Sequence, residues 1–596
     1  MGEKEEPIEL EECDLEKGEK VKLNEEVEPE VASQKNGRSC IGILLIPVLF
    51  LKSFYSERKT VFKYIFLGLL LTGYMVYFII AIARDPLAAK PLIILTLVIL
   101  FLVLYELRFK KLFLLFFKQI KSKVHIKKET KNKITRFLPY VQILICVAFC
   151  IWLLVDMIIR NPSTLISVVG FIVILVVCIC ASTQPKCINW RPVIWGIGLQ
   201  FILGLVVLRT SAGYTAIKFI GDQIATFMKY TDSGSTFVFG YLPSDHIFAF
   251  KVLPMIVFFS MVTNMLFYVG LMQWFIAKLA YLTQITLGTS AIESAVAIAN
   301  IFVGMTEAPL IVRPYLPELT KAEIHSVLTT GLASISFSVF GVYIGFGVDG
   351  VHLLTACVMS APAGLVVSRL LYPEVEKSKF MNTGSLALSA GTNRNIVEAA
   401  AAGASMSIKL VANIGANLIA FLALLAFINA TLHWFGAFVG IPQLSFEVIC
   451  SYLFMPVAFL MGADWEDCFL VGQLFGMKTF LNEFIAYEAM KPFINNRLNQ
   501  NVVPKFINGT IQYMSERSEM VAIHALCGFC NVSSLGIIIG GLSVLMPNKK
   551  KDLAEMSVRA LMGGMIACCM TASISGMLFV EPILASTSNM TATPSP

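Results

Sequence analysis

Residues 300–309 read NIFVGMTEAP and interrupt an apolar stretch that runs from about 284 to 312. The interruption combines a carboxylate, Glu307, with the helix-breaking residues Gly304 and Pro309. Two more apolar stretches are broken in the same way: 478–488 reads KTFLNEFIAYE, and 518–546 contains Gly528, Asn531, Ser533 and Ser534. Interrupted apolar segments that recur along a chain indicate a transporter binding site. Irregular backbone is tolerated at membrane depth only where protein or a water-filled cavity covers it. We predict that the first and third stretches are re-entrant hairpins and that the second is an unwound helix.

The composition around these stretches is that of a membrane protein. The chain has 596 residues, 56% of them apolar and 15% charged, whereas a soluble chain is about 25% charged. A string of soluble domains is therefore excluded. A spanning helix needs about 20 apolar residues, and this criterion selects about 11 segments: residues 63–83, 91–107, 139–159, 164–182, 193–209, 248–277, 325–347, 351–371, 408–430, 444–462 and 556–580.

The predicted fold class is thus an all-α polytopic membrane protein with about 11 transmembrane helices, two re-entrant helical hairpins and an inverted-repeat transport domain. Residues 214–229 have isoleucines at helical spacing on one side and charged residues on the other. This pattern favours a helix that lies in the membrane interface; the alternative is a plain linker. Residues 40–51 are apolar but too short to span.

Charge is distributed unevenly and predicts the orientation. Residues 1–30 hold 13 acidic and 4 basic residues, whereas 11 Lys or Arg lie between Arg108 and Arg136 beside one acid, Glu129. A basic loop between two apolar spans is typical of the cytosolic side, and two spans precede it. The N-terminus is therefore expected in the cytosol. The lysines at 549–551 place that turn in the cytosol too.

The predicted orientation bears on the glycosylation sequons. After the cytosolic turn at 549–551, the last span leads outside, so that Asn589 becomes an expected glycosylation acceptor. The sequon at Asn508 is left undecided.

Glu307 and Glu483 are the most informative residues, because a carboxylate at membrane depth is costly and by default marks function. The alternative is a structural acid paired with a base, Arg313 for Glu307 or Lys478 for Glu483. Two carboxylates are also compatible with acid–base catalysis, but the sequence has no accompanying catalytic motif. The Cys-x-x-Cys at 527–530 lacks a second cysteine pair or a histidine cluster, which argues against a metal site. We therefore expect no enzyme and no cofactor.

The remaining polar groups suit two kinds of ligand. Glu483, Asn531 and Ser534 can accept and donate hydrogen bonds to a hydroxyl-rich solute, and Phe529 adds an apolar face. Asn300, Thr306 and the region of Ser334 and Ile335 offer oxygen atoms without a formal charge. Such a set suits a monovalent cation better than calcium or magnesium. Sodium is the expected ion.

These residues lie in motifs that carry a family resemblance. From about Trp190 to about Phe579 the chain resembles the concentrative nucleoside transporter family in its vertebrate form. The motifs are WRPVIWG at 190–196, YTD at 230–232, NIFVGMTEAP at 300–309, RPYL at 313–316, NEFIAY at 482–487 and LCGFCNVSS at 526–534. The resemblance implies a sodium-coupled nucleoside symporter of the plasma membrane that assembles as a homotrimer and does not bind nucleic acid.

The resemblance also implies roles for individual residues. Residues that would face the nucleobase are Met305, Thr306, Glu307 and Val339. Residues that would hold the ribose or line its pocket are Glu483, Asn531, Ser534 and Phe529. Residues that would bind sodium, partly through backbone carbonyls, are Asn300, Val303, Thr306, Ser334 and Ile335.

The selectivity motif is Gly304-Met305, with Ser338-Val339 in the following helix. In the family, Gly-Met resembles the purine-preferring type, and an apolar, polarizable Met suits a larger ring than a hydrogen-bonding Gln does. We therefore expect purine nucleosides and uridine as substrates. Three departures bear on this expectation: Ser338-Val339 resembles the broad-selectivity pairing, Phe337 replaces the usual Gly, and Cys530 replaces the usual Ala.

The expected organisation follows the chain. The segments are an acidic cytosolic tail and short helix (1–60), scaffold helices (61–210), the interfacial helix with a scaffold helix (211–277), the first hairpin with transport-domain helices (278–371), a linking segment with scaffold or transport helices (372–470), the unwound helix and second hairpin (471–547), the last span (548–580) and an extracellular tail (581–596). The alternatives to a sodium symporter are a broad-selectivity carrier, a proton-coupled carrier, and a nucleoside-gated channel or receptor.

Overall fold

The computed structural model describes helix 59–84, a few positions between 85 and 159, and residues 162–240, 250, 253–381, 388, 393–500 and 502–580 without 508. The chain divides into two units, residues 1–139 and 140–596, which are described separately. The first contributes α2 (Lys59–Arg84), where a span was predicted at 63–83. Several predictions concern residues outside the described part of the chain. These are the acidic tail, the segment 40–51, the basic loop, most of the predicted spans 91–107 and 139–159, and the sequons at Asn508 and Asn589.

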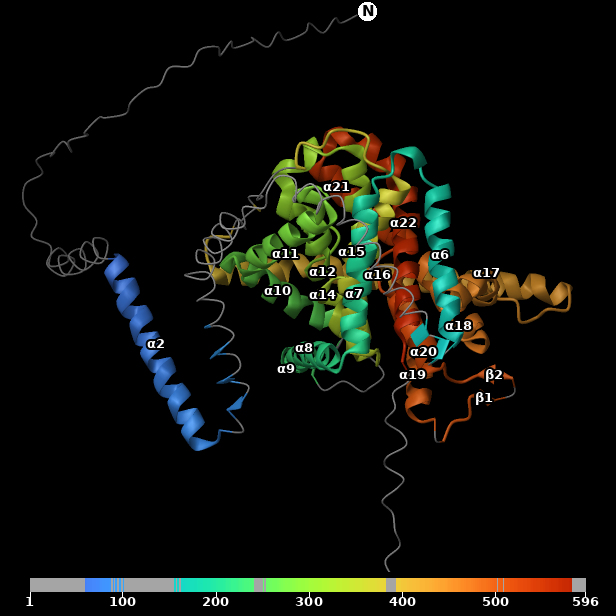
Figure 1. Cartoon of the computed structure of the whole chain (residues 1–596). Helices are drawn as coiled ribbons and strands as arrows, with labels where there is room; N and C mark the ends of the chain where they lie inside the picture. Colours follow the sequence, from blue (N-terminus) through green and yellow to red (C-terminus); the bar gives the residue numbers. More distant parts are fainter. Residues whose placement is uncertain are drawn as a thin grey trace, which may run out of the picture. The chain divides into compact units, whose positions relative to one another are not determined.

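The second unit is helical, and its helices bear out the fold class (Figure 1). Its first part contains α6 (Leu165–Cys180), α7 (Trp190–Arg209), α8 (Ser211–Lys229), α9 (Thr231–Phe239), α10 (Leu253–Val269) and α11 (Leu271–Leu287). Its middle contains α12 (Ala291–Phe302), a 3-10 segment (Ala308–Glu318), α13 (Lys321–Ala333), α14 (Phe337–Gly345), α15 (Gly350–Leu371) and α16 (Ile396–Phe438). Its last part contains α17 (Phe446–Met461), α18 (Cys468–Phe480), α19 (Glu483–Leu498), α20 (Glu516–Leu526), α21 (Val532–Leu545) and α22 (Lys550–Leu578). Between α19 and α20, β1 (Phe506–Ile507) pairs antiparallel with β2 (Thr510–Ile511).

Six helices in the described part of the chain are long and apolar enough to cross a membrane, or seven if one bent pair counts as a span. They correspond to the predicted spans 164–182, 193–209, 325–347, 351–371, 408–430 and 556–580. The prediction of one span at 248–277 is wrong in detail, because α10 and α11 meet at an angle of 78°. Gly270 between them has φ +85°, a backbone conformation that residues other than glycine rarely adopt. At 444–462, α17 has only 16 residues, fewer than the roughly 20 that a crossing needs.

The segment 214–229 is helical, so that the linker alternative is wrong. α8 spans Ser211–Lys229 and begins with the Thr210 side chain accepting the Gly213 N–H at 3.0 Å. It packs against α7 and α15 and runs across the end of α7 (Figure 1). Few of its side chains are buried, as expected of a helix in an interface.

The three interrupted stretches are breaks between helices, but two of them exchange roles relative to the prediction. The first is a hairpin, because α12 turns at 303–307 and packs against the 3-10 segment. α18 and α19 also pack against each other across residues 481–482, so that the second stretch is a hairpin tip. α20 and α21, separated by residues 527–531, instead pack on α22 and make little contact with each other. The third stretch is therefore the broken helix.

The same order of elements thus occurs twice. A hairpin (α12 with the 3-10 segment, or α18 with α19) is followed by a broken helix (α13 and α14, or α20 and α21) and then by a long helix (α15 or α22). The largest clusters of buried apolar side chains lie within and between these elements. α13 packs on both α15 and α22, which places the breaks of the two halves beside a common core.

Candidate functional site

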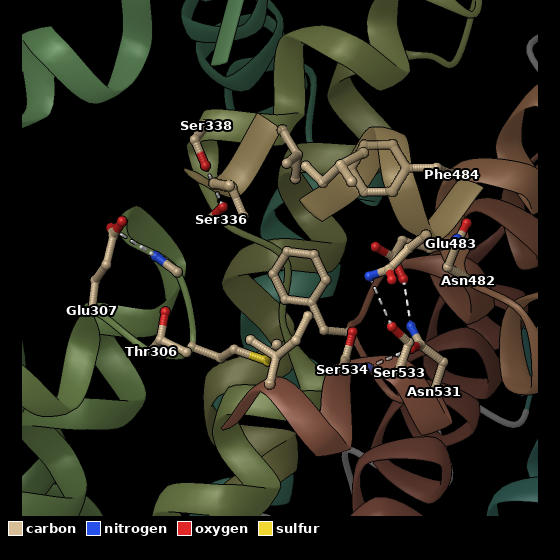
Figure 2. A pocket seen from close by; sticks show the side chains of 18 residues that line it. Thr306, Glu307, Ser336, Ser338, Asn482, Glu483, Phe484, Asn531, Ser533 and Ser534 are labelled. Atoms are coloured by element: carbon tan, nitrogen blue, oxygen red, sulfur yellow. Dashed lines mark hydrogen bonds between the residues drawn. The ribbon is translucent and has the colours of Figure 1, made fainter. Parts of the chain in front are cut away.

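A partly open cavity lies where the two hairpins and the two broken helices meet (Figure 2). Four segments of the chain far apart in sequence line it: 304–307, 336–339, 482–484 and 529–537. A fifth contribution comes from α16 through Leu410, Ile414 and Asn417.

The second half of the repeat contributes a buried carboxylate–amide pair. The Asn531 side-chain amide donates to Glu483 Oε2 at 2.8 Å, and both residues are buried. Asn531 Oδ1 accepts the Ser534 N–H at 2.8 Å as the N-cap of α21, and Asn482 caps α19 in the same way through Ile485 N–H at 3.0 Å. Helix N-termini carry partial positive charge. The N-termini of α19 and α21 therefore both adjoin the Glu483 carboxylate. Their capping residues, Asn482 and Asn531, are of a type that favours a helix start.

The first hairpin contributes Glu307 on the other side of the cavity (Figure 2). The turn is closed by the N–H groups of Glu307 and Ala308, which donate to Gly304 O at 3.0 and 2.9 Å. Glu307 Oε2 accepts the Gly304 N–H at 3.4 Å. Gly304, Met305 and Thr306 line the same cavity, with Val339 of α14 close by.

The structure shows no direct ion pair for either carboxylate in the described part of the chain. Among the described residues, neither Glu307 nor Glu483 has a basic nitrogen within 4.0 Å. Arg313 is exposed, and Lys478 donates to the carbonyl of Ala525 at 2.7 Å. Both carboxylates therefore face the cavity with acceptor capacity to spare.

Four polar lining residues were given no role from the sequence: Ser336, Asn417, Asn482 and Ser533. Asn417 donates to Ser533 Oγ at 3.3 Å, and the hydroxyls of Ser336 and Ser338 are 2.6 Å apart. Asn417 lies in the apolar run of α16, and a polar side chain at membrane depth is itself a signal. Ser336 carries no such signal, because its importance depends on the helix break.

The expected cation ligands are only partly brought together. Ser334 Oγ donates to the carbonyl of Asn300 at 3.1 Å and to that of Ile335 at 3.2 Å, which joins the end of α12 to the break after α13. Val303 is the first residue after α12, and Thr306 lies in the hairpin turn that follows, where it lines the cavity. The Asn300 Oδ1 atom is buried without a hydrogen-bond partner. An orphaned buried oxygen beside backbone carbonyls fits a cation that takes oxygen ligands.

The cysteines of the Cys-x-x-Cys motif lie apart from any metal cluster. Cys527 faces Cys357 and Cys530 faces Cys568, each pair with 3.7 Å between sulfur atoms. Among the described residues, no group of three His, Cys, Asp or Glu side chains is placed to hold a metal ion.

A cavity that holds convergent carboxylate, amide and hydroxyl groups, between paired hairpins and broken helices inside a polytopic helical protein, defines a secondary transporter. Family profiles make the class specific. Profiles described as the N-terminus and the C-terminus of a Na+ dependent nucleoside transporter match residues 169–242 and 352–576, and one described as nucleoside recognition matches residues 249–349. The chain belongs to the sodium-dependent, concentrative nucleoside transporter family, whose members are transporters and not enzymes.

Curated relatives agree with this family. The chain is 49% identical over 531 residues to solute carrier family 28 member 3 of Rattus norvegicus, covering 89% of this chain and 74% of the relative. It is 44% identical over 537 residues to sodium/nucleoside cotransporter 1 of Mus musculus, covering 90% and 82%. A solved structure of CNTnw in an inward-facing substrate-bound state matches with 34% identity and a TM-score of 0.64, covering 70% of this chain and 98% of that one.

Proposed function

We propose that this multi-pass protein imports nucleosides with sodium across the plasma membrane, with a preference for purine nucleosides and uridine. The observation that carries the proposal is the cavity in which the Glu483–Asn531 pair faces the Glu307 turn. Membership of the sodium-dependent nucleoside transporter family supports the coupling ion and the substrate class. We extend the proposal to a homotrimer with a cytosolic N-terminus and an extracellular C-terminus.

Glu483, Asn531 and Ser534 are proposed to hold the ribose. Glu483 accepts the Asn531 amide through Oε2 alone in the described contacts, so that its other oxygen can accept from ribose hydroxyls. Burying those hydroxyls unpaired would be costly. Phe529, which lines the same cavity, is proposed to cover the sugar.

The nucleobase is proposed to lie against Met305, Thr306, Glu307 and Val339. Met305 and Val339 give this side an apolar surface, and Ser338 lies one residue from Val339 on α14. For selectivity, two candidates have separate support. Gly304-Met305 favours the purine type, whereas the higher identity to member 3, 49%, than to cotransporter 1, 44%, favours the broad type.

Sodium is proposed to bind Asn300, Val303, Thr306, Ser334 and Ile335, because it would satisfy the buried Asn300 Oδ1 atom. At about −60 mV one inward sodium ion gains roughly 1.4 kcal/mol electrically, and a tenfold gradient adds about 1.4 kcal/mol. Together these support roughly 100-fold accumulation per ion. Sodium would order the first hairpin, nucleoside would then bind across both halves, and the loaded domain would move.

The proposed boundary of the moving domain follows the packing. α6 packs on α17 and α22, and α7 packs on α15 and α22. The buried Gln200 of α7 donates to Thr571 of α22 at 2.9 Å. We therefore place α6 and α7 with the hairpins rather than in the scaffold expected for 61–210, and keep α10 and α16, which pack on each other, as scaffold.

The test is uptake of labelled inosine, adenosine, uridine, thymidine and cytidine by cells that express this chain, in sodium and then in choline at fixed pH. We expect uptake of inosine, adenosine and uridine that depends on sodium. Uptake indifferent to sodium but raised by acid supports the proton-coupled alternative. Nucleoside-evoked current without accumulation supports the channel. Equal uptake of all five nucleosides supports the broad-selectivity type.

A further inference from the structure

Each half of the repeat brings two helix C-termini together, and in the second half a lysine lies between them. In the first half α12 ends at Phe302 and α13 at Ala333, and Ser334 Oγ donates to Asn300 O at 3.1 Å. In the second half α18 ends at Phe480 and α20 at Leu526, and Lys478 Nζ donates to Ala525 O at 2.7 Å. Asn300 and Lys478 also share a register, because each lies in the last turn of its helix, third from the end.

Lys478 is an unusual lysine, since its side chain is 0% exposed. Among the described residues no carboxylate oxygen lies within 4.0 Å of its ammonium. Its neighbours are the Ala525 carbonyl, the Phe475 ring at 5.6 Å from the ring centroid, and the thiols of Cys530 and Cys568. Buried charge is costly unless it is compensated. Here the compensation comes from the C-terminal ends of α18 and α20, which carry partial negative charge and orphaned carbonyls, and from the Glu483 carboxylate, whose charge interacts with Lys478 without a direct ion pair.

The corresponding place in the first half lacks a built-in cation. Asn300 ends in an amide rather than an ammonium, and its Oδ1 atom is buried without a partner. A cation is therefore supplied by the chain at one pair of helix ends, and an oxygen in need of a cation is present at the other.

We propose that the Lys478 ammonium is the built-in cation of the second half and fills the place that corresponds to the sodium site of the first. This inference rests on the sodium symport proposed above. Lys478 ties α18 to α20 and thereby positions Glu483, which follows on the next helix, against Asn531 beyond the break. The ribose side of the cavity is then assembled at any sodium concentration, whereas the nucleobase side depends on sodium.

The test compares three substitutions of Lys478 by uridine and inosine uptake across a range of sodium concentrations, normalised to surface protein. Lys478→Arg keeps the charge, Lys478→Gln keeps a hydrogen-bond donor without charge, and Lys478→Ala leaves space. Hydrogen bonds to charged groups contribute about 1.5–3 kcal/mol, so we expect Lys478→Gln to lower maximal uptake about tenfold or more. Lys478→Arg should keep the sodium dependence of the unmodified chain. The control is Lys409→Ala, an exposed lysine of α16.

Lys478→Ala provides the sharper outcome. If the position is a cation site, external cations should refill it, so that sodium activation becomes steeper and needs higher concentrations, and methylammonium restores part of the uptake. Normal uptake by Lys478→Gln with an unchanged sodium curve overturns the proposal, as does a Lys478→Ala variant that reaches the surface and that no cation restores. If neither Lys478→Gln nor Lys478→Ala reaches the surface, the surface expression of Lys478→Arg decides. Lys478→Arg at the surface supports the need for a charge, and Lys478→Arg missing from the surface overturns the proposal. Sodium-independent uptake by the unmodified chain would instead refute the proposed function.

Discussion

At the scale of single residues, the Glu483–Asn531 pair should decide whether the ribose is held. Glu483→Gln removes the charge that strengthens its hydrogen bonds, each worth about 1.5–3 kcal/mol, so uptake should fall about 10- to 100-fold. Asn531→Ala should act similarly and also remove the cap of α21. Uptake of labelled inosine, normalised to surface protein, measures both.

Two controls separate binding from folding in this experiment. Glu488→Gln makes the same change at an exposed position of α19 and should leave uptake unchanged. Asn531→Ser keeps a capping oxygen but loses the amide that donates to Glu483, and should be as impaired as Asn531→Ala. Unimpaired uptake by Glu483→Gln and Asn531→Ala would remove the ribose assignment.

Met305 should set the choice of base. Met305→Gln introduces an amide that can pair with a pyrimidine edge, and we expect uptake of thymidine and cytidine to rise relative to inosine. The measurement is the ratio of uptake rates for the three nucleosides, with Met562→Gln, at an exposed position, as control. A ratio that does not change would leave selectivity to other lining residues such as Ser338.

The sequence predicted well the site residues whose charge is unfavourable at membrane depth, and predicted poorly the neutral residues that are easily buried. Glu307 and Glu483 were conspicuous as carboxylates in apolar stretches, and both line the cavity. Ser336 and Ser533 were assigned no role, because a serine at membrane depth can hydrogen-bond to its own helix and needs no special explanation. Their position in the cavity follows from where the helices break.

At the scale of elements, the first hairpin is anchored by a buried ion pair. Glu293 caps the start of α12 through Ser290 N–H at 3.0 Å and pairs with Arg369 of α15 at 2.5 Å. Arg369→Met would leave the buried carboxylate unpaired, at a cost of about 3–5 kcal/mol. We expect a lower melting temperature of the purified protein and less protein at the cell surface.

The matched variants identify the cause of that loss. Arg313→Met, at an exposed position, should have little effect. Adding Glu293→Gln to Arg369→Met removes the uncompensated charge of Glu293 while keeping a capping oxygen, and should recover part of the stability. Glu374, which pairs with Arg369 at 3.3 Å, loses its arginine partner in both variants. A double variant as unstable as Arg369→Met would show that packing around Arg369, and not the charge of Glu293, matters.

Sequence patterns located the three interrupted stretches but did not distinguish a hairpin from a broken helix, and they missed the breaks at Gly270 and at 334–336. The residues 481–482 and 527–531 are both interruptions in apolar stretches. Whether the chain reverses or continues there depends on which helices pack across the break, and this is tertiary information. Likewise, Gly270 lies in an apolar run that passed as one span, although α10 and α11 meet there at 78°.

At the scale of the whole molecule, ligand binding should stabilise the folded protein, and sodium should control that effect. A ligand at 100 times its Kd stabilises by about 2.7 kcal/mol. We expect inosine to raise the melting temperature of the purified protein in sodium but not in choline. Equal shifts of the melting temperature in sodium and in choline would show that nucleoside binding does not depend on sodium. As a control, Glu483→Gln should abolish the shift.

One helix has a consequence for the lipid around the protein. α16 runs for 43 residues, which at 1.5 Å per residue is roughly 65 Å, whereas the hydrocarbon core is about 30 Å thick. Such a helix lies oblique to the bilayer or extends beyond its hydrocarbon core, and Asn417 near its middle reaches the cavity. Because a change in bilayer thickness alters the tilt of a mismatched helix, the acyl-chain length of the surrounding lipid becomes a mechanical input to the substrate cavity.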